Sequence, residues 1–404
     1  MKYLTPLSRL VITVGIALLA SVASAQNTTT APAPAAASTG PYKVLNTDKV
    51  GGMGNWDYVF ADTDTRQLYI PRSNRVDVYD LDSLAPLGNI SNTTSVHGVA
   101  TDTKSGHAFC SSNPVVMWDT KTLATIKTIP VNGSPDGILF EPATERVYIL
   151  SHRTPNVTAI DAISGNVVGT LDLGGQPEQA ASDGQGHVYI DLEDQDAIAV
   201  VDATAFKLTG NYDISSQGGG PGGLAMDAKN RILFAACHDP ATMVILNADT
   251  GKIITALPIG TGVDAAEFNP NTLEAFSSQG DGTLTVIKEN SPTDFVVEQN
   301  VKTKSGARTS TLDTKTNQIY LVTAERMARP PTPPAAPAAT ASAATPASNT
   351  TAAPAATPAA SNTTANVATA TPPPPPPGPG QRYRGGRGGA MVPGSFTILV
   401  VGKS

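Results

Sequence analysis

The chain has 404 residues, with 27 Lys and Arg against 34 Asp and Glu, so its net charge at pH 7 is −7. This acidity argues against non-specific nucleic-acid binding, which needs a basic surface. Two cysteines are too few for a disulfide framework, and no segment after the N-terminus is apolar enough to span a membrane. The composition therefore favours a globular protein that depends on neither disulfides nor nucleic acid.

Residues 1–25 have the pattern of a secretory signal peptide. Lys2 and Arg9 precede an apolar run that is too short to span a bilayer comfortably, and Ala-Ser-Ala at 23–25 offers a cleavage site before Gln26. An uncleaved anchor is the alternative. Without Lys2 and Arg9 the net charge becomes −9. We expect export to a bacterial periplasm or beyond, with residues 26–40, QNTTTAPAPAAASTG, as a low-complexity linker.

A repeat with a period of about 40 residues follows, which is the length of a four-stranded propeller blade and of WD40-like repeats. A polar turn precedes each second strand, and a third strand such as NVTAIDAISG and an outer strand such as IITALPI follow it. The second strand recurs as RQLYIPRS, GHAFCSSN, ERVYILSH, GHVYIDLE, NRILFAAC, LEAFSSQG and NQIYLVTA. Cys110 and Cys237 fall at the ends of such strands in distant copies, so we expect two small buried side chains that do not pair.

The two ends of the repeat array predict how the ring closes. The last copy ends with a third strand, SFTILVVGKS at 395–404, while PYKVLNTDKV at 41–50 has the pattern of an outer strand. Joining them in one blade leaves no exposed sheet edge. The innermost strands, such as GGLAMD, are rich in small residues because strands crowd near the axis. We predict an all-β, seven-bladed β-propeller over 41–404, closed by N-terminal strand exchange.

Residues 328–393 interrupt the last blade with a long Pro/Ala/Thr-rich insertion. Such a segment cannot bury a core and is expected to be extended or disordered. RYRGGRGG near its end would bind an anionic partner through Arg382, Arg384 and Arg387, or it is a solvated loop tip.

The repeated strand and turn pattern resembles the YVTN-type seven-bladed propellers, the YncE family of exported bacterial proteins. ERVYILSHRTPNVTAIDAISGNVVGTLDLGGQP matches most clearly, and the resemblance covers 43–327 and the terminal strand. It implies the fold and export, and it implies no catalytic residues because these are strand and turn motifs. The family includes binding proteins, and related propellers include lactone hydrolases. The insertion in the last blade departs from the compact family pattern.

Propeller geometry places two sets of residues around one mouth of the central channel. The residues entering the innermost strands are Asp57, His97, Asp136, Glu178, Gly222, Asp264 and Arg308. The loops between second and third strands include Arg72, Asn113, His152, Arg153, Glu193, Asp194, His238, Asp239 and Asp281.

Four carboxylates in the first set repel one another, so either a cation lies among them or some of their pKa values rise. The set considered for a metal is Asp136, Glu178 and Asp264, whose oxygens suit Ca²⁺ or Mg²⁺, while a carboxylate with His97 favours Zn²⁺ or Mn²⁺. Arg308 would instead neutralise Glu178 or Asp264, or orient the carboxylate of an organic ligand. The ligand-binding candidates are Trp56, as an apolar wall, Asp57, His97, His152, Glu193, His238 and Arg308.

Three functions remain open. The leading hypothesis is an exported monomer without catalytic activity that binds a small molecule or a protein at the channel mouth. The second is a metal-dependent hydrolase of lactones or esters, with the cation on Asp136, Glu178 and Asp264 and with His97 as the base. The third is a cell-surface interaction module that acts through 328–393. The chain contains no C-x-x-C-H, G-x-S-x-G or G-x-x-x-x-G-K-[ST] motif, which argues against the enzymes that use them.

Overall fold

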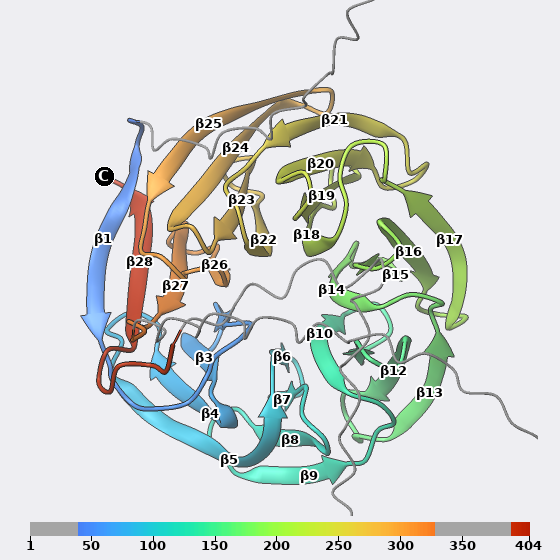
Figure 1. Ribbon diagram of the computed structural model, residues 1–404. Helices are drawn as coiled ribbons and strands as arrows, with labels where there is room; N and C mark the ends of the chain where they lie inside the picture. Colours follow the sequence, from blue (N-terminus) through green and yellow to red (C-terminus); the bar gives the residue numbers. More distant parts are fainter. Residues whose placement is uncertain (1–38, 328–388) are drawn as a thin grey trace, which may run out of the picture. The chain divides into compact units, whose positions relative to one another are not determined.

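A computed structural model describes residues 39–327 and 389–404, and within these ranges the chain forms 28 β-strands and no helix. The strands make seven antiparallel sheets of four, arranged as blades around a central axis (Figure 1). The predicted all-β, seven-bladed propeller is confirmed. The predicted signal peptide, nearly all of the linker, and the insertion up to residue 388 lie outside the described residues. Within the described ranges, no helix has the length and apolar character needed to cross a membrane.

The first four blades, each from its innermost to its outermost strand, are β2 (Phe60–Asp62), β3 (Gln67–Pro71), β4 (Ser73–Asp80), β5 (Pro86–Val96); β6 (Val99–Asp102), β7 (His107–Cys110), β8 (Val115–Asp119), β9 (Thr125–Ile129); β10 (Pro135–Glu141), β11 (Arg146–Ser151), β12 (Asn156–Asp161), β13 (Val167–Asp172); and β14 (Pro177–Ser182), β15 (His187–Leu192), β16 (Ala197–Asp202), β17 (Lys207–Asp213). The last three are β18 (Pro221–Asp227), β19 (Ile232–Cys237), β20 (Thr242–Asn247), β21 (Ile253–Pro258); β22 (Val263–Asn269), β23 (Glu274–Gln279), β24 (Thr283–Ser291), β25 (Asp294–Lys302); and β26 (Ser310–Asp313), β27 (Gln318–Thr323), β28 (Thr397–Lys403), β1 (Tyr42–Lys49).

Blade 7 is closed by strand exchange, as predicted. β1 pairs antiparallel with β28, from Tyr42 opposite Lys403 to Lys49 opposite Thr397 (Figure 1). Tyr42 is buried, and its ring meets Phe276 of blade 6 edge-on with 5.5 Å between centroids. The first strand therefore completes the last sheet and also packs against the blade beside it.

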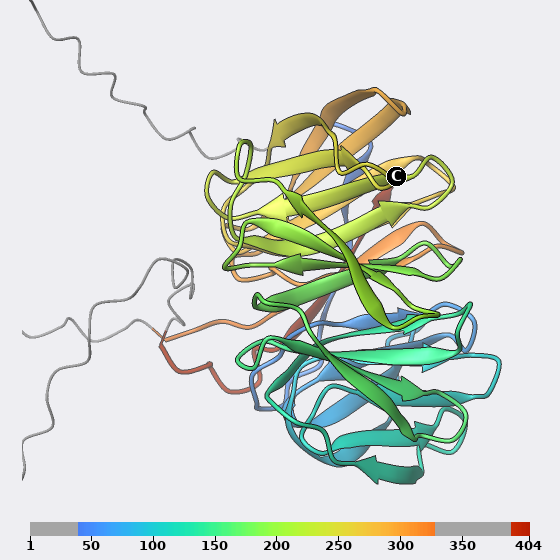
Figure 2. The same cartoon turned by 90° about the vertical axis from the view of Figure 1, so that its right-hand side faces the viewer.

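The described arms of the insertion run side by side out of blade 7 (Figure 2). The Met327 amide donates to the Ala390 carbonyl over 2.9 Å, and the Val392 amide donates to the Glu325 carbonyl over 2.8 Å. Met391 is buried in the apolar cluster between blades 7 and 1. The segments on the two sides of the insertion are thus hydrogen-bonded to each other where they leave the blade.

Apolar side chains hold each blade to the next. Seven clusters of buried residues lie one at each interface between neighbouring blades. Trp118 of blade 2 and Tyr69 of blade 1, for example, are both fully buried with ring centroids 5.8 Å apart. Both cysteines are buried and free, which confirms their predicted state. Crowding near the axis is also confirmed, because a Cβ on Gly223 would lie 2.8 Å from the Ala265 carbonyl carbon.

Candidate functional site

The residues predicted to enter the innermost strands do converge on the channel mouth. Asp136, Glu178, Gly222 and Asp264 are each the second residue of their strand, in β10, β14, β18 and β22. In all four strands the pairing with the neighbouring strand shifts register at this point. A β-bulge re-aims a side chain out of the regular alternation of a strand. The three acids therefore leave the regular alternation of their strands at the strand entry.

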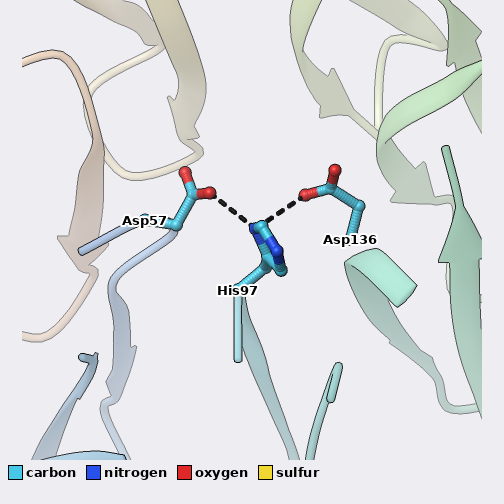
Figure 3. A group of neighbouring side chains, drawn as sticks. All are labelled: Asp57, His97 and Asp136. Atoms are coloured by element: carbon cyan, nitrogen blue, oxygen red, sulfur yellow. Dashed lines mark hydrogen bonds and ion pairs between the residues drawn. The ribbon is translucent and has the colours of Figure 1, made fainter. Parts of the chain in front are cut away.

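The first group of side chains forms around His97, which immediately precedes Gly98 and β6. Its Nδ1 lies 2.8 Å from Asp57 Oδ2 and 3.2 Å from Asp136 Oδ1, so the imidazole sits between carboxylates of two other blades (Figure 3). A single imidazole nitrogen beside two carboxylates either carries a proton that both carboxylates accept, or it binds a cation together with them.

The second group forms around His152, in the loop after β11. Its Nδ1 lies 2.9 Å from Glu178 Oε2, and its Nε2 lies 3.6 Å from Glu193 Oε2. On the other oxygen of Glu178, the Tyr58 hydroxyl donates a hydrogen bond from blade 1, across the channel from blade 4. Each side chain of these two groups is partly exposed, with between 16% and 30% of its surface open to solvent, in His97, His152, Asp57, Asp136 and Glu178. Protein covers the rest, so a solute in the mouth can still contact each of them.

Arg308 forms the third group. Its Nε lies 3.1 Å from Asp264 Oδ2, and its Nη2 lies 3.9 Å from Asp57 Oδ1. The Arg308 carbonyl accepts a 2.5 Å hydrogen bond from the Ser278 hydroxyl, which fixes the backbone where the arginine enters blade 7. The charge of Asp264, the largest influence, raises the pKa of Arg308, so the guanidinium stays positive. Of the two carboxylates predicted to pair with Arg308, it therefore contacts Asp264 and not Glu178.

The protonation states of the mouth follow from burial and crowding. Burial, with the charges of Glu178 and Asp57, raises the pKa of Asp136 well above its usual value. Burial alone would lower the pKa of His152, but the contact with Glu178 and the charges around it outweigh that and raise it to about 9. Burial opposes ionisation of Glu178, yet His152 and the Tyr58 hydroxyl together hold its pKa below the usual value. His152 therefore carries its proton at neutral pH, and burial and the neighbouring carboxylates oppose ionisation of Asp136.

His238 supplies the position that blade 5 leaves empty in the ring. The innermost strand of that blade enters with Gly222, and a Cβ there would lie 2.8 Å from His238 Nε2. The glycine therefore makes room for an imidazole from the loop after β19. Burial lowers the pKa of His238, while the charge of Glu178 opposes this and that of Arg308 adds to it. The charges of the His152 group, through Glu178, and of Arg308 thus both act on His238.

Trp56 and Arg72 lie in the structure as packing groups. The Trp56 ring lies 5.3 Å from Phe396 in the cluster between blades 1 and 7, with the Arg326 guanidinium 5.2 Å above it. Arg72 is fully buried, and its guanidinium carbon lies 3.7 Å from the centroid of the same Phe396 ring. Its Nη1 lies 3.6 Å from Asp77 Oδ2. Trp56 therefore joins the mouth to the base of the insertion.

Two other loop carboxylates accept hydrogen bonds from the loop that leads into the innermost strand of the same blade. Asp194 accepts a 2.6 Å hydrogen bond from the Gln176 amide, and Asp281 accepts one of 2.7 Å from the Thr261 amide. These groups shape the loops around the mouth and leave the histidines and Asp136 at its centre.

Sequence reasoning did not single out two groups of the channel. Tyr58 follows Asp57 directly, and its place at a strand entry was the available signal for a role beyond packing. Glu267 lies further along β22 in the predicted innermost-strand segment DAAEFN, and burial raises its pKa to about 8. Its position three residues after Asp264, in the same strand, was a signal of a second ionisable group on β22.

Two overlapping sets of side chains have the composition of metal ligands. One is Asp57, His97 and Asp136, and the other is Asp136, His152 and Glu178; within each, one donor atom per residue lies within 4.8 Å of the others. Asp264, predicted together with Asp136 and Glu178, belongs to neither set and contacts Arg308 instead. Together the two sets offer two imidazoles and three carboxylates, with Asp136 shared between them.

Comparisons with known proteins establish the fold alone. No model of a known protein family matches the sequence. No curated protein matches it either. Among solved structures, that of U3-55K superposes with a TM-score of 0.59 at 10% identity, covering 71% of this chain and 92% of the other. The WD40 repeats of RRP9 give 0.60 at 9% identity, with coverage of 72% and 92%. A chain of the mitotic checkpoint complex gives 0.61 at 13%, with coverage of 73% and 96%. The protein is a seven-bladed propeller with WD40-like neighbours.

Proposed function

We propose that the protein is an exported, YVTN-type propeller that binds a small polar ligand at the channel mouth. The observation that carries the proposal is the convergence of ionisable side chains from all seven blades, centred on Asp136 between His97 and His152. Six blades contribute the residue that enters the innermost strand, and blade 5 contributes His238.

The energetics of the mouth favour a ligand. Gathering carboxylates in a mostly buried place raises their free energy unless protons or a bound group compensate. Here the pKa of Asp136 is raised, which opposes its ionisation, and His152 carries a proton because its pKa is raised to about 9. A ligand with positive charge or hydrogen-bond donors would compensate the carboxylates in place of protons. It would then make its own contacts with the carboxylate oxygens. Ionisable groups with perturbed pKa values that gather in one partly exposed place are a mark of a functional site.

The family and the compartment are part of the same proposal. The strand and turn motifs that resemble YncE proteins lie in confirmed strands, such as β11 and β12, which supports the assignment. The pattern of residues 1–25 supports export. Sequencing the N-terminus of protein from a periplasmic fraction tests this. A chain that begins at Gln26 supports it, and a cytoplasmic chain that keeps Lys2 and Arg9 contradicts it.

A second candidate function is hydrolysis of lactones or esters. It is favoured by one observation, the contact of His97 Nδ1 with Asp57 Oδ2 at 2.8 Å, since a carboxylate orients an imidazole that takes a proton from water. Turnover of simple γ-lactones, abolished in a His97→Gln variant, would support this function.

Ligand binding is tested by thermal unfolding of the purified protein with millimolar γ-lactones, short carboxylic acids and primary amines, each in the presence of a chelator. A ligand present at 100 times its Kd stabilises the folded state by about 2.7 kcal/mol. We expect at least one class to raise the Tm of the wild type and to leave the Tm of Asp136→Asn and Arg308→Gln unchanged.

A matched control comes from another histidine–carboxylate pair. His187 Nδ1 lies 2.9 Å from Asp183 Oδ2, and Arg231 binds the same carboxylate outside the mouth. His187→Gln should keep the wild-type response. If no class shifts the wild type, or if the mouth variants respond like His187→Gln, the mouth is not the ligand site.

A further inference from the structure

We propose that Asp136 bridges two divalent transition-metal ions at the channel mouth, one held with Asp57 and His97 and the other with His152 and Glu178. This inference rests on the proposed function, since it names an occupant of the same site. The ions would be resident cofactors, and a polar ligand that already binds the metal-free mouth would gain further contacts with them.

The donor atoms already lie near the spacing that an ion requires. Two ligand atoms bound at about 2.1 Å in a tetrahedral arrangement are about 3.4 Å apart. Around His97 Nδ1 the carboxylate oxygens lie at 2.8 and 3.2 Å, and around His152 Nδ1 the Glu178 oxygen lies at 2.9 Å. In both sets every donor atom lies within 4.8 Å of the other two, so side-chain adjustments would admit an ion on each side of Asp136.

The second histidine provides an independent sign of a missing partner. Its Nδ1 is buried without a well-directed hydrogen bond, although the Glu178 oxygen is 2.9 Å away. Metal binding releases the proton of a histidine ligand, so an ion here would replace the proton that the imidazole carries in the metal-free mouth. It would then bind both His152 Nδ1 and the Glu178 oxygen.

Neighbouring groups hold the proposed ligands in place. The Tyr58 hydroxyl donates to Glu178 Oε1, which leaves Oε2 beside His152. Such hydrogen bonds orient carboxylate ligands and sharpen metal affinity. Arg308 has its Nε on Asp264 at 3.1 Å, so its charge is directed mainly at a carboxylate outside both sets. Tyr58 is thus a positioning residue, and Asp264 keeps the guanidinium close to its own oxygen.

The donor types select the metal. Each set supplies one imidazole nitrogen and two carboxylates, which suits Zn²⁺ or Mn²⁺, whereas Ca²⁺ and Mg²⁺ prefer oxygen alone. Three protein donors per ion leave at least one coordination position open, as in sites where the metal binds a water or a substrate. Two metals that share a carboxylate are also a common arrangement for binding and activating oxygen-containing ligands.

The test loads the chelator-stripped protein with Mn²⁺ and measures bound metal per chain by elemental analysis, with electron paramagnetic resonance of the same samples. We expect two ions per chain and a spectrum with exchange coupling between them. One ion per chain, none, or an uncoupled six-line spectrum would overturn the bridged pair. This measurement on the wild type does not depend on whether any variant folds.

Variants then assign the ligands. Asp136→Asn should lower the Mn²⁺ affinity of both sites by about 10-fold or more. Loss of a group that only orients a metal ligand already costs about 10-fold in affinity. His97→Gln and His152→Gln should each leave one ion and remove the coupling, while His187→Gln keeps two. Unchanged Mn²⁺ binding in Asp136→Asn, with wild-type circular dichroism, would also refute the inference. Ligand-dependent stabilisation in chelator without any Mn²⁺ binding would refute the metal pair and leave the proposed function standing.

Discussion

Two adjacent glycines of β18 should respond very differently to alanine. A Cβ on Gly223 would lie 2.8 Å from the carbonyl carbon of Ala265 and 2.9 Å from the amide nitrogen of Ala266, both backbone atoms of blade 6. A Cβ on Gly222 would meet only the His238 ring, also at 2.8 Å. Backbone in the next blade moves only if two blades separate, whereas an imidazole on a loop can rotate.

The magnitude follows from the overlap. Ordinary contacts of a Cβ begin at 3.4 Å, so Gly223→Ala is too close by about 0.6 Å. Overpacking of this kind costs about 1–3 kcal/mol, offset by about 0.4–1 kcal/mol because alanine restricts the unfolded chain. We expect urea unfolding to show a net loss of about 1–2 kcal/mol for Gly223→Ala and no loss for Gly222→Ala.

The second variant also tests the mouth. Because Gly222→Ala displaces His238, it should change the chemical shifts of the His238 imidazole while stability stays near that of the wild type. Equal losses of stability in the two variants would refute the packing argument. An unmoved His238 in Gly222→Ala would refute the claim that the glycine makes room for its ring.

Three further predictions concern single contacts. Tyr58→Phe removes the hydroxyl that donates to buried Glu178, so it should cost about 1–3 kcal/mol in urea unfolding, and an unchanged stability would contradict the contact. Burial opposes ionisation of Glu274, but Lys403 at 2.7 Å and other donors hold its pKa below the usual 4.5. The folded-state pKa is thus lowered, so this stabilisation is present above pH 4.5 and is lost as the pH falls through the lower value. Lys403→Met should lower the free energy of unfolding at pH 7. On acidification the variant should lose less stability than the wild type does, and parallel pH profiles of stability would contradict this. Burial raises the pKa of Cys110 to about 11, so Ellman's reagent should label it only after unfolding, and rapid labelling of the native protein would contradict its burial.

The fold could be predicted from the sequence because one structural unit is repeated. Period-two strands such as ERVYILSH recur with the same turns, and each became a second strand, here β11. The two ends of the repeat array predicted the pairing of β1 with β28. The N-terminal end has an extra outer strand and the last blade lacks one, so pairing them completes that blade. Repetition supplies several copies of the same weak signal, so the fold does not depend on any one of them.

The site could be predicted only in part. Strand position places Asp57, His97 and Asp136 at one mouth, and they lie there in contact. Which acid pairs with Arg308 depends on side-chain reach and on bulges of about one residue, which strand patterns do not encode. The sequence-based metal set therefore included Asp264, whereas the structure groups two histidines around Asp136.

Two aromatic residues show the same limit. Trp56 and Tyr58 flank Asp57, and their neighbours in the sequence do not indicate what each ring contacts. Trp56 packs on Phe396 of blade 7, and Tyr58 reaches Glu178 of blade 4. Contacts between blades distant in the sequence follow from closure of the ring, so they become visible only once the blades are in place.

The most direct test of the account is anomalous diffraction from crystals grown with Mn²⁺, with data collected near the manganese absorption edge. We expect two anomalous peaks, one on each side of Asp136, beside His97 and beside His152. A map without peaks at the mouth, or with peaks only at other acidic side chains, would contradict it.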